Sequence, residues 1–204
     1  MITDERRARI HAVAARRQLD LAVFMESVHK PHNLSAVART CDAVGVMDVH
    51  AVPGESGLSA MRSASQGAHR WIRIHRHTEA GPPLEELAGK GYQRLAAHLS
   101  DEAVDFRTID YTRPTVVVLG TEKFGLQEKT LEHCDRFVTI PMVGMAQSLN
   151  VSVAAAVILF EAQRQREAAG MYDSQAGDSD YRRALADEWM QREFDRRTRR
   201  AGQG

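Results

Sequence analysis

The polar residues that could do chemistry fall in three segments, each of which follows a predicted strand. The first segment, Glu26-Ser-Val-His-Lys-Pro-His-Asn33, places an amide at a predicted helix start and the Arg39 guanidinium two turns into that helix. We expect Asn33 to be the N-cap of the helix and Gly45 to lie just past its end. Taken alone, this segment is better explained by a capping Asn33 and a solvated surface Arg39 than by a catalytic pair.

The second segment, Leu119-Gly-Thr-Glu-Lys-Phe-Gly-Leu126, ends a predicted strand and places Glu122 between two glycines. Glycine permits close backbone approach or a positive φ angle, so Gly120 and Gly125 could let a ligand lie against this turn. The alternative is an ordinary tight turn between a strand and a helix.

The third segment, Ile140-Pro-Met-Val-Gly-Met-Ala-Gln-Ser-Leu-Asn-Val-Ser152, is a glycine- and proline-bearing loop that enters a long predicted helix. Ser148 and Asn150 lie at the start of that helix, where free backbone N–H groups bind polar ligands readily. Helix capping alone explains these two residues, but it does not explain the whole loop.

Several common site patterns are missing from the sequence. There is no glycine-rich dinucleotide or phosphate-loop motif, no serine nucleophile elbow, and no zinc-ligand spacing among the nine histidines. His29 and His32 flank a Lys-Pro pair, which is weak support for a metal ligand pair. We therefore predict no metal site.

The elements that must position the three segments alternate between strand and helix. This alternation predicts an α/β fold with a mostly parallel sheet and helices on both faces, in which ligands bind beyond the carboxyl ends of the strands. Strands are predicted at 21–25, 47–52, 71–74, 93–98, 115–120 and 137–140, and helices at 33–44, 63–68, 84–90, 126–133, 148–169 and 181–200.

Composition and charge narrow the class of protein. The 204 residues are 43% hydrophobic, enough for a core, and the longest apolar run, 153–160, is too short for a membrane span. Cys41 and Cys134 have no metal-ligand spacing and are expected to be reduced thiols, and no secretory signal is visible, so we expect a cytoplasmic protein.

The formal net charge is zero, but its distribution is uneven. Residues 1–17 carry five arginines against two acids, and residues 181–204 carry seven arginines against four acids. Arginine suits phosphate recognition, so these ends could bind a nucleic-acid backbone, although solvated helical ends are the alternative. We expect three parts: a basic N-terminal helical arm at 1–19, a central α/β domain at 20–169, and a linker with a basic C-terminal helix at 170–204.

Together the three segments, in this order, resemble the three motifs of the SpoU, or SPOUT-class, RNA ribose 2′-O-methyltransferases. The matching patterns are Asn-x5-Arg at 33–39, Gly-x-Glu-x-x-Gly-Leu at 120–126, and Ile-Pro-Met-x-Gly-x-x-x-Ser-Leu-Asn-Val-Ser at 140–152. The resemblance covers roughly residues 20–168. Within the family, the chain is most similar to the TrmH-type branch, which methylates a guanosine in the tRNA D-loop (nucleotide 18).

The resemblance implies a deep trefoil knot in the C-terminal part of the fold, S-adenosyl-L-methionine as the cofactor, and a homodimer that binds tRNA, with no DNA or membrane partner. It implies catalytic roles for Arg39, Asn33, Glu122, Ser148 and Asn150. It further implies that the cofactor is bound by His98, Leu119, Gly120, Ile140, Met142, Ser148 and Leu149, and RNA by Arg9, Arg16, Arg17, Arg164 and Arg166.

The role of Arg39 has two interpretations. The resemblance implies a general base, but a guanidinium offers hydrogen-bond donors only. We prefer the interpretation that Arg39 fixes a phosphate beside the reacting ribose and stabilises developing alkoxide charge, while a phosphate oxygen or a transient contact takes the proton.

The alternatives for function are methylation of ribosomal RNA or of another tRNA position, and a non-catalytic RNA-binding relative. A flavodoxin-like regulatory domain is a further alternative, but 29–32 has the wrong chemistry for its phosphate or acidic site. We expect Trp189 in the last helix to pack against the protein rather than to stack on a base.

Overall fold

The computed structural model describes all residues except 1, 29, 54–69, 122–123, 174–178 and 202–204. The chain forms two compact units: Leu19–Arg166, and a second unit that combines Met1–Gln18 with Glu167–Gly204. The first unit contains the three polar segments. No helix in the described parts of the chain is long and apolar enough to cross a membrane.

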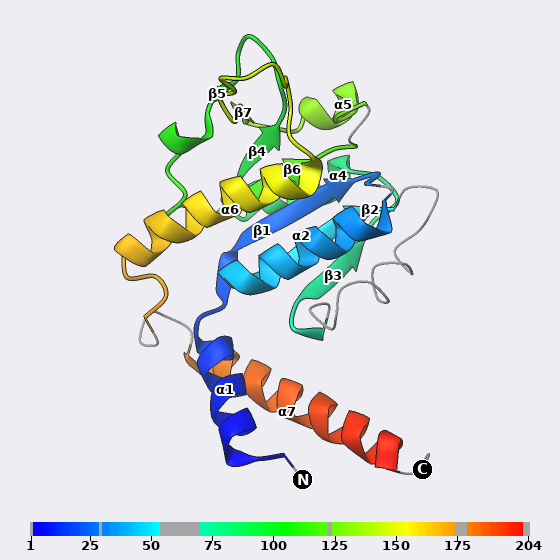
Figure 1. The fold of residues 1–204 in the computed structure, drawn as a ribbon, viewed down its shortest axis with the longest axis vertical. Coiled ribbons are helices and arrows are strands. Elements are labelled where there is room, and N and C mark those ends of the chain that lie inside the picture. Colours follow the sequence, from blue (N-terminus) through cyan, green and yellow to red (C-terminus); the bar gives the residue numbers. More distant parts are fainter. Residues whose placement is uncertain (1, 29, 54–69, 122–123, 174–178, 202–204) are drawn as a thin grey trace. The chain divides into compact units, whose positions relative to one another are not determined.

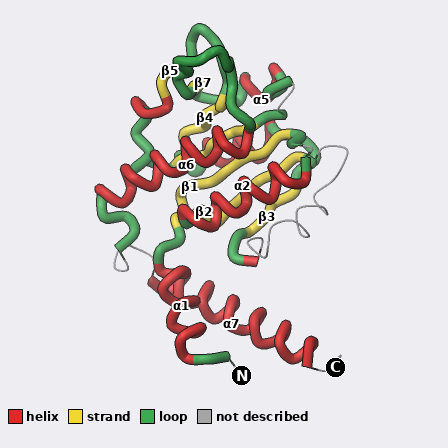
Figure 2. The backbone as a smooth tube through the Cα atoms, viewed as in Figure 1, coloured by secondary structure: helices red, strands yellow, loops and turns green. Residues whose placement is uncertain are grey.

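The larger unit is built on a seven-stranded sheet, which Figure 2 shows as adjacent strands. The pairs β1–β6, β2–β3, β4–β6, β4–β7 and β5–β7 are all parallel, as predicted. In sheet order the strands are β3 (Arg73–Arg76), β2 (Val46–Val52), β1 (Gln18–Glu26), β6 (Thr115–Leu119), β4 (Gln93–Ala97), β7 (Arg136–Thr139) and β5 (Val104–Asp105).

Helices cover both faces of this sheet because the central strands are apolar on both sides. In β1, Leu21, Val23 and Met25 belong to the core beneath α2 and α6, whereas Ala22 and Phe24 belong to the core beneath α4. Figure 1 shows α2 and α6 side by side on one face. The helices are α2 (Pro31–Val44), α4 (Gly81–Gly89), α5 (Glu128–Leu131) and α6 (Val151–Ala168), with a short 3₁₀ helix at Phe106–Thr108.

The start of α2 corrects one prediction. The helix begins at Pro31, with Lys30 as its N-cap, so Asn33 is not the cap but lies inside the first turn, where it is buried. Proline at the first helical position explains the earlier start, because its fixed φ angle suits a helix and its missing N–H has no helical partner to lose. The predicted end is confirmed: Gly45 is the C-cap with φ 83°.

The six predicted strands are all observed, with shifts of up to three residues at their ends. The strand β5 was missed because two residues carry no readable periodicity. The helix predicted at 126–133 is shorter than expected, and the one predicted at 63–68 lies outside the described residues.

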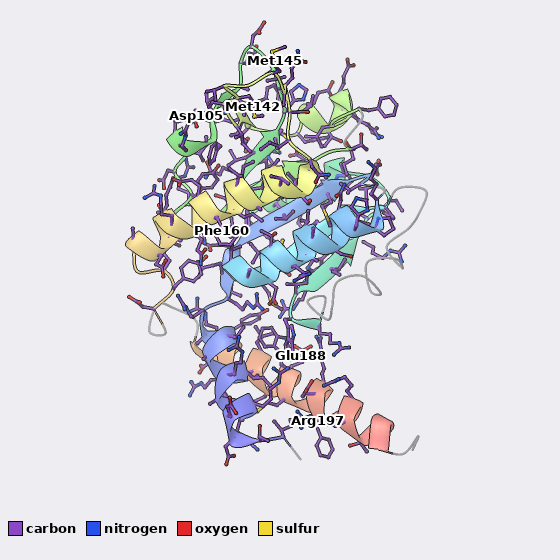
Figure 3. The ribbon with its side chains drawn as sticks, in the orientation of Figure 1. Asp105, Met142, Met145, Phe160, Glu188 and Arg197 are labelled. Carbon is purple, nitrogen blue, oxygen red and sulfur yellow. The ribbon has the colours of Figure 1, made fainter. Side chains whose placement is uncertain are left out.

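The smaller unit pairs α1 (Asp4–Ala15) with α7 (Ser179–Ala201). Trp189 is buried, and the Arg17 guanidinium lies over its ring at 5.1 Å, so the prediction that this tryptophan packs against the protein is confirmed. Glu193 is also buried and forms ion pairs with Arg196 and Arg197, the latter labelled in Figure 3. These contacts hold basic side chains along one helix in a defined arrangement.

Two arginines that were expected to bind RNA are instead part of the interior. Arg17 and Arg166 are both 0% exposed. Arg166 donates hydrogen bonds to Asp20 Oδ1 at 2.5 Å, to the Tyr111 carbonyl at 2.8 Å and to the Arg113 carbonyl at 3.0 Å. Its donors are directed at protein acceptors, and in this structure neither of the two buried side chains, predicted to bind RNA, is accessible to it.

Replacing Arg166 should therefore affect folding. We expect Arg166→Met to lower the free energy of unfolding by about 3 kcal/mol, because Asp20 and two carbonyls lose a buried donor. Urea denaturation measures the change. The matched control is Arg164→Met, which removes an exposed guanidinium paired with Glu161 and should cost less than about 1 kcal/mol. Equal effects of the two substitutions would contradict the structural role.

Candidate active site

A cavity of about 310 Å³ opens at the carboxyl ends of β4, β6 and β7, beside the start of α6. Segments that are distant in sequence meet there, as expected for a parallel sheet. All seven residues predicted to bind the cofactor line this one cavity: His98, Leu119, Gly120, Ile140, Met142, Ser148 and Leu149.

One wall of the cavity is a tight turn after β6. Thr121 and Gly125 form an isolated antiparallel bridge, with N–H to carbonyl distances of 2.9 and 3.0 Å. A Cβ atom on Gly120 would lie 2.2 Å from the Gly125 carbonyl carbon, so only glycine fits at this position. Glu122, which was predicted to be catalytic, lies in this turn but outside the described residues.

A buried carboxylate holds the end of this turn against β1. Glu26 is 3% exposed and accepts hydrogen bonds from the Gln127 backbone N–H at 2.9 Å and the Thr130 hydroxyl at 2.6 Å. The next residue, Ser27, has φ 52°, a backbone conformation that residues other than glycine seldom adopt. Glu26 thus fixes the first polar segment to the second one.

A second contact fixes the first polar segment to the third one. Asn150 Nδ2 donates to Asn33 Oδ1 at 3.2 Å, which joins the first turn of α2 to the start of α6. Asn150 Oδ1 accepts from the Ser152 N–H at 2.9 Å and from its hydroxyl at 2.6 Å, so Asn150 is the N-cap of α6. This cap explains why α6 begins three residues later than predicted.

Arg39 lies on α2, about 9 Å along the helix axis from Asn33 at 1.5 Å per residue. Its side chain is exposed, and no hydrogen bond or ion pair joins it to another described residue. Ser148 is exposed at the rim of the cavity. The structure therefore brings together Asn33, Asn150 and the cavity, and places a charged donor on the helix that carries Asn33.

The cavity itself is nearly uncharged. Its described lining contains no Asp, Glu, Lys or Arg, and its ionisable side chain is His98, whose ring packs edge-on against Phe137. No cluster of metal-ligating side chains occurs among the residues that the structure describes. Cys134 lies just after α5, and burial raises the pKa of its thiol to about 12, so the thiol stays protonated at neutral pH. The described lining can therefore hold a ligand through apolar contacts and backbone groups, while charged side chains such as Arg39 lie outside the cavity.

The other three residues predicted to bind RNA are exposed. Arg9 and Arg16 are exposed on or next to α1, and Arg16 pairs with Glu167 at 3.5 Å. Arg164 is exposed on α6 and pairs with Glu161 at 2.7 Å. These three guanidinium groups remain accessible to a phosphate, in contrast to Arg17 and Arg166.

Comparison with known proteins agrees with this geometry. The model of the SpoU rRNA Methylase family matches residues 20–160. The chain belongs to this family. Its match to the crystal structure of the TrmH/SpoU tRNA modifying enzyme of Aquifex aeolicus has a TM-score of 0.84 at 39% identity and covers 95% of this chain and 98% of that one. The fold is therefore that of the SpoU family, while the knot stays a prediction.

Relatives in the SpoU family are similar over most of the chain. The tRNA (guanosine(18)-2′-O)-methyltransferase of Escherichia coli K12 is 56% identical over 82% of this chain and 73% of its own length. The enzyme of the same name from Thermus thermophilus is 50% identical over 93% of this chain and 98% of its own length. The AdoMet-bound rRNA methyltransferase from Sinorhizobium meliloti matches with a TM-score of 0.64 at 29% identity, over 76% of this chain and 59% of that one.

Sequence reasoning missed several residues of the site. Thr121, Phe124 and Gln147 also line the cavity, and Glu26 anchors its wall. The Gly-x4-Gly spacing could have indicated that Phe124 lies in an exposed turn. No sequence signal could have found the partners of Glu26, because they lie about a hundred residues away.

Removing the Glu26 carboxylate should loosen this wall. We expect Glu26→Ala to lower the free energy of unfolding by about 2 kcal/mol, because the buried Thr130 hydroxyl and the part-buried Gln127 N–H lose their acceptor. Hydrogen exchange at the Gln127 amide should accelerate. The matched control, Glu128→Ala, removes an exposed carboxylate from the adjacent helix and should leave that exchange rate unchanged. Unaltered exchange in Glu26→Ala would contradict the anchoring role.

Proposed function

We propose that this protein transfers the methyl group of S-adenosyl-L-methionine to the ribose 2′-oxygen of guanosine 18 in the D-loop of tRNA. The observation that carries the proposal is that residues of the second and third family motifs line one cavity. The first motif is joined to them by the hydrogen bond that Asn33 accepts from Asn150, whose chain neighbours Leu149 and Val151 line the cavity. The relatives at 50–56% identity have this activity in their names. Those names specify tRNA, which favours tRNA over ribosomal RNA as the substrate.

The cavity fits the cofactor in size and chemistry. Its volume lies at the lower end of the range for small-molecule sites, which are mostly apolar with a few polar groups. Leu119, Ile140 and Leu149 provide apolar contacts, and the backbone at Gly120 allows close approach because no Cβ intervenes. When bound, S-adenosylmethionine supplies an electrophilic methyl group on sulfur.

The residues around the cavity must orient the 2′-hydroxyl toward that methyl group. Positioning of this kind supplies a large part of the rate enhancement in a displacement reaction. In our mechanism Arg39 holds a phosphate beside the reacting ribose and stabilises negative charge that develops on the 2′-oxygen. The hydroxyl proton leaves to a phosphate oxygen of the RNA, since a guanidinium has no acceptor.

In this proposal exposed arginine side chains bind the phosphates of the RNA. Arg9, Arg16 and Arg164 are exposed and can contact phosphates. The reacting 2′-hydroxyl also distinguishes RNA from DNA, so the substrate must be RNA. Because each phosphate contact displaces a counterion, tRNA affinity should fall steeply with salt.

We also propose that the protein acts as a homodimer in the cytoplasm. The loop after β7 supports the dimer, because Val143 and Met145 are fully exposed there while Met142 lines the cavity (Figure 3). Exposed apolar side chains next to a binding site favour a protein interface.

Gly120 tests the cofactor site. We expect Gly120→Ala to weaken S-adenosylhomocysteine binding at least tenfold, because its Cβ would overlap the Gly125 backbone and open the turn. Isothermal titration calorimetry measures the affinity, and circular dichroism checks that the sheet remains folded. Gly89→Ala is the control, since a Cβ there meets no atom within 4 Å. Undiminished affinity in Gly120→Ala would place the cofactor elsewhere.

Arg39 tests the catalytic proposal. We expect Arg39→Ala to abolish methyl transfer to a tRNA transcript, and Arg39→Lys to reduce kcat strongly, because an ammonium cannot bind phosphate with the planar fork of arginine. Radiolabelled methyl transfer measures the rate, and nucleotide-resolution mapping locates the modified ribose. Near-normal turnover by Arg39→Lys would exclude the fork geometry, and methylation of ribosomal RNA alone would exclude the proposed substrate.

A further inference from the structure

An aromatic side chain is exposed at the mouth of the cavity. Phe124 lines the cavity, yet its side chain is 78% exposed. It lies in the turn after β6, between the two residues that form the antiparallel bridge. A large apolar ring that is exposed at the edge of a binding site can contact a ligand that arrives from solvent.

The backbone around Phe124 is held on several sides. Its N–H donates to the Thr121 hydroxyl at 2.9 Å, and the bridge closes the turn around it. Gly125 follows with φ 68°, and Gly120 packs directly against the Gly125 backbone. Beyond the turn, Glu26 binds the Gln127 N–H. The backbone of Phe124 and of the residues that follow it is therefore tied to the end of β6 and to β1.

The chemistry at the cavity indicates what this ring would meet. The carbon that carries the 2′-oxygen of a ribose is bonded to the carbon that carries the base. A nucleotide whose 2′-oxygen reaches the cavity must therefore bring its base to the cavity mouth. Proteins that bind unpaired RNA bases commonly stack them on aromatic rings, because every base has an exposed π face.

We propose that Phe124 is the platform on which the base of the target nucleotide stacks while its ribose is methylated. The inference rests on the proposed function and adds a substrate-binding residue to it. Stacking on one face is tolerant of base identity, so Phe124 positions the nucleotide, and selection of guanosine belongs to other groups. The ring takes no proton and forms no bond; it raises affinity for RNA and orients the ribose.

Binding of the cofactor adenine is the competing role for Phe124. The two roles differ in which ligand loses affinity when the ring is removed. A platform for the RNA base changes KM for tRNA and leaves the affinity for S-adenosylhomocysteine unaltered. A contact with adenine changes that affinity first, and it does so without any RNA.

The test uses the full chain and tRNA transcripts, including one with 2-aminopurine at position 18, whose fluorescence is quenched by stacking. We expect Phe124→Ala to raise KM for tRNA about tenfold and to reduce the quenching on binding, because base–aromatic stacking contributes about this much per base. Affinity for S-adenosylhomocysteine should change less than about twofold, which is small against the tenfold stacking effect. Phe124→Trp should restore both KM and quenching, because it retains an aromatic face.

The matched control is Phe160→Ala. Phe160 is 51% exposed on α6, well away from the start of that helix, and it does not line the cavity (Figure 3). Its removal should leave KM and quenching unchanged. Unchanged KM and quenching in Phe124→Ala would overturn the inference, as would a matching loss of S-adenosylhomocysteine affinity. Failure of the unsubstituted protein to methylate any tRNA would instead contradict the proposed function, so the two proposals fail separately.

Discussion

The candidate site depends on two sets of hydrogen bonds, both made by the segment that runs from the end of β1 to the first turn of α2. Asn33 accepts a hydrogen bond from the Asn150 side-chain amide. Glu26 accepts hydrogen bonds from the Gln127 backbone N–H and from the Thr130 hydroxyl. Through them one short stretch of chain holds both the loop after β6 and the start of α6. A parallel sheet brings its carboxyl ends to one edge, but it leaves the loops beyond that edge free to move. These contacts restrict the loops and so give the cavity a defined wall.

The charged side chains of the candidate site lie outside the described lining of the cavity. The described lining of the cavity carries no carboxylate or guanidinium, so a ligand there is held by shape and backbone. The Arg39 guanidinium lies outside, exposed on α2. In the proposed mechanism the phosphate that Arg39 binds comes with the RNA, so the charged groups that assist the reaction are complete only when the substrate is bound. The proposal thus couples catalysis to RNA binding and needs no titratable base in the cavity.

Much of the fold could be predicted from the sequence, because buried parallel strands leave a strong local signal. The run Val116-Val117-Val118 is apolar on both faces of β6 and was assigned correctly. The start of α2 was not, because an asparagine that could cap a helix follows a proline that begins it. Local patterns also missed β5, which is held by its partner β7 rather than by its own two residues.

Most of the candidate site residues could be predicted from the order of the three motifs. The contacts that hold these residues in place could not be predicted from the sequence. Arg164 and Arg166 are two residues apart on one helix and have the same side chain, yet one is exposed and the other fully buried. Two residues on a helix differ by about 200° in direction, so one faces solvent while the other faces Asp20 and the carbonyls at the base of the sheet. The residue type predicts that an arginine side chain donates hydrogen bonds to anionic groups or carbonyl oxygens. Only the packing of the chain decides whether those partners are already present within the protein or arrive with the RNA.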